Sequence, residues 1–165
     1  MEPLTEQEIR AAFVNCTKGE AKRLSVPRDL ADRPWADLDY LGWRDPQAPD
    51  RAYLVTVLDG RTTALALRSS SAGSWQTRRS MCSMCLTTHT GGVSLMVAPR
   101  AGKAGQQGNS VGAYICDDLA CSLYVRGKRD AGAGARLHET LTLDEKIRRT
   151  VTNIAAFVAK VTGAV

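Results

Sequence analysis

Four of the five cysteines in this chain stand in two pairs that could hold a metal ion. Cys82 and Cys85 are separated by two residues, and Cys116 and Cys121 by four. Zn²⁺ is commonly bound by four thiolates at the corners of a tetrahedron, at about 2.3 Å from each sulfur. A tight turn can direct the first pair to one ion, and the second gap suits one cysteine at a strand end and the other in a helix. The spacing therefore predicts a structural four-cysteine zinc site.

A disulfide framework and a redox-active pair are the alternative interpretations of these cysteines. Disulfide scaffolds are typical of short secreted chains with a signal peptide, whereas we expect no leader here and the cysteine count is odd. A redox pair should open a helix, but residues 87–92 are turn-rich and open none, and the second pair stays unexplained. His89 is a further candidate ligand, which we expect at the surface or hydrogen-bonded to a ligand because four thiolates complete the site.

The composition describes a folded protein with a basic surplus. The chain has 165 residues, a hydrophobic fraction of 44%, a net charge of +5 and a pI near 9.1. A positive surface suits an acidic partner, either a nucleic acid or an acidic protein face, although solubility alone could explain so modest a charge. No run approaches the roughly 18 apolar residues of a membrane span. We therefore expect a cytoplasmic protein without membrane contact.

The predicted fold class is α+β: an antiparallel sheet with N- and C-terminal helices and a treble-clef four-cysteine zinc finger. We expect residues 1–165 to form one domain in three segments. Residues 1–75 supply a leading helix and a β-hairpin, residues 76–126 the zinc-finger module, and residues 127–165 a loop and the C-terminal helix.

Capping signals predict the two terminal helices. Thr5 and Glu8 have capping-box spacing and precede apolar residues at helical intervals, which predicts a helix from about residue 6 that ends or bends near residues 18–19. A continuation over residues 20–24 by one or two turns stays open. Cys16 falls on its apolar face and is predicted to be buried. Thr142 opens a second capping box and a helix over 143–162, whose apolar stripe is typical of core packing.

Alternating patterns and turn residues predict the strands. The predicted strands are 39–43, 51–58, 61–68, 75–81, 93–98 and 111–115. Asp59-Gly60 is typical of a two-residue hairpin. The glycine-containing segments 99–110 and 127–134 are predicted to be mobile loops. Asp117 and Asp118 suit the first turn of a helix that also carries Cys121.

Several of these stretches resemble a known family. They are the run from Phe13 to Leu24 with Pro27, the Cys82–Cys85 pair, the stretch Tyr114–Arg126 with the second cysteine pair, and the closing helix. Together they are similar to the C-terminal zinc-binding domain of the elongation-factor-G-binding proteins, the FusB/FusC-like family. The resemblance extends from about Thr5 to Lys160, and the motif around the second pair is its specific part.

The resemblance implies a cytosolic, non-enzymatic protein that binds elongation factor G, with one Zn²⁺ on the four paired cysteines. In members that confer fusidic acid resistance, binding releases the drug-stalled factor from the ribosome. Those members carry an additional N-terminal helical domain, whereas this sequence begins with one predicted leading helix, so factor binding is the firmer expectation. No small-molecule substrate is expected.

The partner surface is predicted to surround the finger, where basic and apolar side chains could meet an acidic protein face. The candidates are Arg78, Arg79, Met84, Tyr124, Arg126, Lys128 and Arg129. Met84 is a candidate because an apolar side chain on the first zinc turn is hard to bury.

Two other functions stay open at this point. An RNA- or ribosome-binding zinc module would use the same basic residues on phosphates, but the chain offers few aromatic side chains for base stacking. A zinc enzyme would keep an open coordination position, which four thiolates close, and only two histidines are available for acid–base chemistry.

Overall fold

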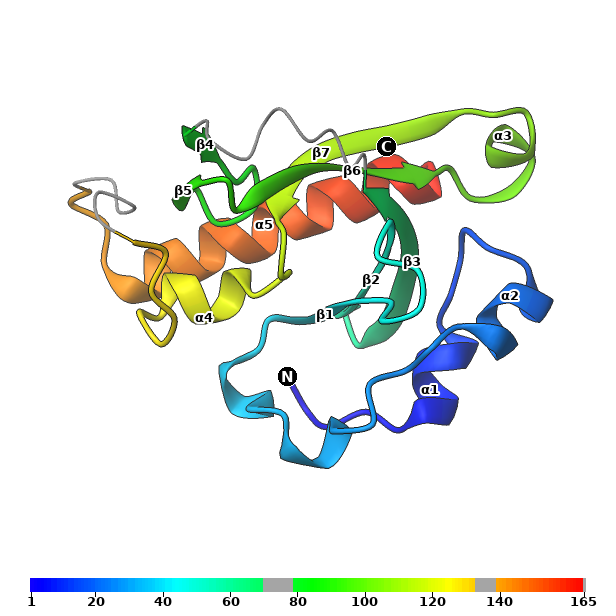
Figure 1. The fold of residues 1–165 in the computed structure, drawn as a ribbon, viewed down its shortest axis with the longest axis horizontal. Coiled ribbons are helices and arrows are strands. Elements are labelled where there is room, and N and C mark those ends of the chain that lie inside the picture. The colour runs from blue at the N-terminus through cyan, green and yellow to red at the C-terminus, as the bar shows by residue number, and fades with distance from the viewer. Residues whose placement is uncertain (70–78, 133–138, 165) are drawn as a thin grey trace.

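One antiparallel sheet organises the molecule, with a different layer of chain packed on each of its faces (Figure 1). The computed structural model describes residues 1–69, 79–132 and 139–164. In these residues the strand order is β1-β2-β3-β6-β7, and β4 and β5 form a separate small ribbon. Together with the terminal helices and the buried cysteine cluster, this confirms the predicted α+β class.

The strands are β1 (Tyr40–Arg44), β2 (Arg51–Leu58), β3 (Arg61–Ser69), β4 (Arg79–Met81), β5 (Thr88–Thr90), β6 (Val93–Pro99) and β7 (Ser110–Cys116). The helices are α1 (Glu6–Ala11), α2 (Lys18–Arg23), α3 (Gly102–Gln106), α4 (Cys121–Val125) and α5 (Leu143–Thr162), with two short 3₁₀ turns, η1 (Leu30–Asp32) and η2 (Trp35–Asp37).

The predicted hairpin of β2 and β3 is confirmed, and it lies between β1 and β6 in the sheet. Asp59 and Gly60 connect the strands with φ angles of 49° and 74°, the positive values that a type I′ turn requires. Successive side chains of a strand point to opposite faces. Tyr53 and Val55 therefore join an N-terminal core with Ile9, while their neighbours face a second core.

The second core lies between the sheet, the cysteine cluster and α5. Leu54 and Leu65 face it from the central hairpin, and Ile154 and Phe157 enter it from α5. Because both faces are covered, β2 is buried over most of its length rather than alternately buried and exposed.

The predicted leading helix is wrong in its length. α1 ends at Ala11, and α2 begins at Lys18 after a second capping box formed by Thr17 and Glu20. Thr17 favours a helix start over helix continuation, because its side chain accepts from the Glu20 N–H and the Glu20 carboxylate accepts from the Thr17 N–H. Cys16, between the helices, is half-buried and not buried as predicted.

Residues 12–15 run beside β3 and complete its free edge. Phe13 forms a parallel bridge to Ala64. The Asn15 side-chain amide bridges the gap between β3 and β6. Its Nδ2 donates to the Ala66 carbonyl at 2.9 Å and to the Pro99 carbonyl at 3.0 Å. Its Oδ1 accepts from the Ala66 N–H at 2.8 Å. One side chain thereby replaces the missing ladder between β3 and β6.

The segment 99–110 is an ordered connection with a short helix, α3, and not the predicted loop without regular structure. The Arg100 N–H donates to the Asn109 carbonyl at 2.9 Å, and the Ala101 N–H donates to the Val161 carbonyl at 2.9 Å. A Cβ at Gly105 would lie 1.8 Å from the Arg100 carbonyl oxygen, so glycine is required there by close backbone approach.

α5 has the predicted bounds and the predicted capping box at Thr142. Gly163 ends it in the left-handed conformation with φ 75°, as is common after a helix. The predicted apolar stripe lies on the sheet side, where Ile154, Val158 and Val161 are buried. No helix in the described ranges has both the length and the apolar character needed to cross a bilayer.

One predicted strand and one predicted loop lie only partly within the described residues. In the predicted strand 75–81, β4 covers Arg79–Met81, and residues 75–78 lie outside the described residues. The predicted loop 127–134 is described as far as residue 132, without regular structure after Gly127. The division into segments ending at residues 75 and 126 stays a prediction.

Replacing Gly42 with Ala should destabilise the protein by about 1–3 kcal/mol, because overpacking forces neighbouring groups apart. A Cβ at Gly42 would lie 2.4 Å from the Leu119 Cβ and 2.9 Å from the Tyr40 ring. Gly19→Ala in α2 is the matched control, because its Cβ would meet no atom closer than 3.9 Å and should add about 0.5–1 kcal/mol. Urea denaturation measures both. Equal stability of the two variants would contradict this packing.

Candidate metal centre

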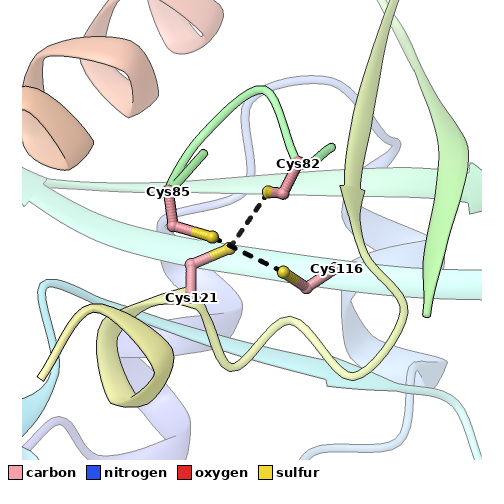
Figure 2. Close-up of side chains that lie close together, drawn as sticks. All are labelled: Cys82, Cys85, Cys116 and Cys121. Atoms are coloured by element: carbon pink, nitrogen blue, oxygen red, sulfur yellow. Dashed lines mark hydrogen bonds between the residues drawn. The ribbon is translucent and has the colours of Figure 1, made fainter. Parts of the chain in front are cut away.

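Two turns bring the four paired cysteines to one point beneath α5 (Figure 2). Cys82 and Cys85 come from the turn between β4 and β5, Cys116 ends β7, and Cys121 begins α4. The four Sγ atoms lie within 4.8 Å of one another, and all four residues are buried. The Sγ atoms of Cys82 and Cys121 are 3.6 Å apart, as are those of Cys85 and Cys116.

Backbone hydrogen bonds shape the first turn around its sulfur atoms. The Leu86 N–H donates to the Cys82 carbonyl at 3.0 Å, and Leu86 has a φ of 57°. The Met84 N–H donates to the Cys82 Sγ at 3.3 Å. A donor aimed at sulfur favours the thiolate over the thiol. The turn is therefore built for a charged Cys82.

The second turn differs from the prediction, because Asp117 and Asp118 precede the helix instead of forming its first turn. α4 begins only at Cys121. The Asp118 carboxylate accepts from the Ala120 N–H at 3.0 Å, and Leu119 takes a positive φ of 54°. This left-handed residue allows the chain to reverse between Cys116 and Cys121.

The donor set fits Zn²⁺. Four sulfurs at tetrahedral corners, each about 2.3 Å from an ion, would lie about 3.8 Å apart, close to the 3.6 Å separations here. All four donors are soft, none is exposed, and together they complete a tetrahedron. The cluster is a treble-clef zinc site, and the ion would be held by Cys82, Cys85, Cys116 and Cys121.

The pKa shifts of the four cysteines favour a bound cation at this site. Hydrogen bonds from the Cys116 and Cys121 thiols lower the pKa of Cys82 well below its ordinary value. Hydrogen bonds with the Cys121 thiol, and then with those of Cys82 and Cys85, raise the pKa of Cys116, and burial raises that of Cys121. Without a cation, the four groups can only share protons. A divalent ion would convert all of them to thiolates and compensate their charge.

Tyr40 lies against the cluster with its hydroxyl buried and without a hydrogen-bond partner of good geometry among the described residues. Burial raises its pKa well above the ordinary value, and so does the neighbouring Cys121 thiol. The phenol therefore keeps its proton. A thiolate at Cys121 would provide the acceptor that this hydroxyl lacks.

His89 is buried in β5, with only 5% of its surface exposed, and contacts a ligand of the predicted zinc site. Its Nε2 lies 3.3 Å from the Cys116 Sγ. The imidazole ring packs edge-on against Tyr124 with 4.6 Å between ring centroids. A Cβ at Gly92 would lie 3.0 Å from the His89 Nδ1, so this glycine leaves space for the ring. The sequence predicts His89 either at the surface or hydrogen-bonded to a zinc ligand, and the structure has the second placement.

A chain of contacts leads from His89 to the surface. The Tyr124 hydroxyl donates to the Asp118 Oδ2 at 2.7 Å. Asp118 also pairs with Arg129, whose Nε lies 2.9 Å from the same oxygen. Tyr124 and Arg129, both predicted partner residues, are thus positioned by Asp118 in the turn between Cys116 and Cys121.

The predicted exposure of Met84 is wrong. Only 2% of its surface is accessible, because α5 covers the zinc turn and the Asn153 Nδ2 donates to the Met84 carbonyl at 2.9 Å. Met84 belongs to the core around Ile154 and Phe157. A long-range helix contact of this kind is not visible in the local sequence.

The basic residues of the predicted partner surface differ in how exposed their side chains are and in their ion pairs. The Arg126 side chain is only 14% exposed and makes two bonds to Asp39, at 2.7 and 2.9 Å, which ties α4 to the chain before β1. Lys128 is 54% exposed and pairs with Asp37. Arg129 is 52% exposed, Arg79 is exposed in β4, and Arg78 lies outside the described residues.

Two exposed apolar residues near the finger were not predicted. Met81 precedes Cys82 and is 43% exposed, and Tyr114 on β7 is also 43% exposed. The Ser83 N–H donates to the Tyr114 carbonyl at 2.7 Å, which places this tyrosine beside the zinc turn. Strand alternation could have found Tyr114, since Ala113 and Ile115 on either side face inward more.

The comparison with known families agrees with this geometry. Residues 8–161 match the family described as the FBP C-terminal treble-clef zinc-finger. No curated protein and no solved structure matches the chain at a significant level.

Replacing Cys116 with Ser should abolish stoichiometric zinc binding and unfold the finger, because structural zinc contributes roughly 10–16 kcal/mol in small modules. Elemental analysis and thermal unfolding of the purified variant measure both effects. Cys16→Ser is the matched control and should keep wild-type zinc content, because Cys16 lies in the N-terminal layer. Equal zinc content in both variants would contradict the four-cysteine site.

Replacing His89 with Ala should increase the rate of zinc loss to a chelator by about tenfold, because groups hydrogen-bonded to ligands orient them. Thr90→Ala is the control, because Thr90 is exposed on the same strand. Zinc transfer to a coloured chelator gives the rate, and the folded variant should still bind one ion. An unchanged rate would show that the contact with Cys116 has no effect on the metal.

Proposed function

The chain belongs to the FBP C-terminal treble-clef zinc-finger family, and we propose that it binds translation elongation factor G and promotes its release from the ribosome. The observation that carries the proposal is the family match over residues 8–161, which includes all four clustered cysteines. On this proposal the protein acts in the cytosol, where it meets the factor on or off the ribosome.

The closed metal centre supports a binding role over a catalytic one. Catalytic zinc usually keeps one position for water or substrate, whereas four buried thiolates leave none. Zinc here would hold two turns in fixed positions and thereby present the side chains around them. We propose that the protein has no enzymatic activity of its own at this centre.

The proposed contact surface lies at the zinc-finger end of the molecule. Figure 1 shows β4, β5 and the chain after α4 at this end. It combines exposed basic side chains, Lys128 and Arg129, with the exposed apolar Met81. Tyr124 supports Arg129 from beneath, with the guanidinium carbon 5.9 Å from the ring centroid.

We propose two changes to the predicted set of contact residues. Met84 is buried, so Met81 and Tyr114 become the apolar candidates. Arg126 holds Asp39 inside the fold, which leaves Lys128 and Arg129 as the cations better placed to meet carboxylates of a protein partner.

Replacing Lys128 and Arg129 together with Gln should weaken binding to purified elongation factor G by about tenfold, because charge-assisted contacts to the partner are lost. Their present ion pairs are half-exposed and contribute about 0–1 kcal/mol each, so the melting temperature should change little. Isothermal titration of the factor with each variant measures the effect. Arg61→Gln is the control, because Arg61 is exposed at the hairpin end of β3.

Two results would contradict the proposal. Absence of binding between the zinc-loaded wild-type protein and the factor would remove its basis. Binding to ribosomal RNA fragments with a steep salt dependence, but not to the factor, would establish the RNA-binding alternative instead.

A further inference from the structure

A polar cleft of about 570 Å³ lies on the sheet face opposite to the metal centre. Its floor includes Tyr53 and Ala66 of the central hairpin, and α2 forms one wall with Arg23 and Leu24. The volume is within the range of small-molecule sites. No step of the proposed partner binding uses this cleft.

Three guanidinium groups line the cleft without an ion pair. Arg51 of β2 and Arg68 of β3 are directly opposite each other on the same face, and Arg23 of α2 also lines the cleft. All three are exposed, and none makes an ion pair with a carboxylate of the described residues. Like charges opposite each other in a sheet are destabilising. The repulsion between Arg51 and Arg68 therefore lowers the stability of the fold, and an anion bound between the two side chains would offset it.

The carboxylates of the cleft are already committed to other partners. Glu20 accepts from the Thr17 N–H and hydroxyl, both at 2.8 Å. These bonds, followed by the charges of Arg23 and Arg51, lower the Glu20 pKa. Asp45 is buried and accepts from the Gln47 N–H at 2.9 Å and the Tyr53 hydroxyl at 3.0 Å. Both oxygens of Asp45 are thus engaged, whereas Glu20 uses one oxygen for Thr17. The cleft is lined by three cations and only these two carboxylates.

We propose that this cleft binds a small phosphorylated molecule, with its phosphate among Arg23, Arg51 and Arg68. Guanidinium groups match phosphate oxygens in pairs, and three of them suit a dianion better than a single carboxylate. The uncharged remainder of the ligand would lie on Leu24, Ser25 and the Asn15 region, which also line the cleft.

The limited extent of this half-open cleft favours a small molecule over a nucleic acid backbone. A polymer would need a basic track continuing beyond the cleft, whereas its far wall is the turn at Asp45 and Ala48. The ligand would bind to the N-terminal layer, so its binding is separable from that of a partner at the zinc finger.

The test is the response of the zinc-loaded full chain to inorganic phosphate and pyrophosphate at constant ionic strength, against chloride. Amide chemical shifts of ¹⁵N-labelled protein should move at Ala48 and Tyr53, and saturate. In the Arg51→Gln/Arg68→Gln double variant the dissociation constant should rise about tenfold or more, because charge-assisted hydrogen bonds are lost. Arg61→Gln, on the same hairpin, should bind as the wild type does.

Loss of repulsion should leave the double variant as stable as the wild type before phosphate is added, which separates lost binding from unfolding. Absent or non-saturating shifts with both anions would overturn the proposal. Equal affinity of the double variant and the Arg61→Gln control would do the same, as would shifts at these residues with an RNA oligomer only. None of these outcomes depends on elongation factor G.

Discussion

Four thiolates buried within a few ångströms repel one another, and a divalent cation among them removes that repulsion. This interaction joins two segments with thirty residues between them. One is the turn after β4, and the other runs from the end of β7 to the start of α4. Neither short turn has a core of its own. Their geometry therefore depends on the metal, and so do the side chains that they present.

The metal centre is also fastened to the sheet and to α5. Leu119, in the second turn, packs against Gly42 of β1 so closely that no side chain fits there. Arg44 at the end of β1 bonds both the carbonyl and the carboxylate of Asp117, at 2.6 and 2.8 Å. Asn153 of α5 holds the first turn through the Met84 carbonyl. The finger is therefore an integral part of the second core and not an appended module.

Local signals in the sequence predicted much of this fold. The capping box at Thr142, the Asp59-Gly60 turn and the paired cysteines each depend on residues close together, and each was correct. The second capping box at Thr17 is equally local, but the apolar pattern that continues across it predicts one longer helix.

Two further errors concern contacts between distant segments. Met84 is buried because α5 crosses above it, and segment 99–110 is ordered because Ala101 bonds Val161 at the end of α5. Arg126 pairs with Asp39, far earlier in the chain, and its role in partner binding stays a prediction. A zinc site can be predicted from spacing, whereas the exposed surface around it depends on which distant elements cover it.

Zinc K-edge X-ray absorption of the purified protein tests the central claim most directly, because it counts the atoms bound to the metal. The account predicts four sulfur atoms at about 2.3 Å and no nitrogen, with His89 outside the first coordination sphere. A spectrum with three sulfurs and one nitrogen at about 2.0–2.1 Å would contradict it. Such a result would make His89 a ligand in place of one cysteine.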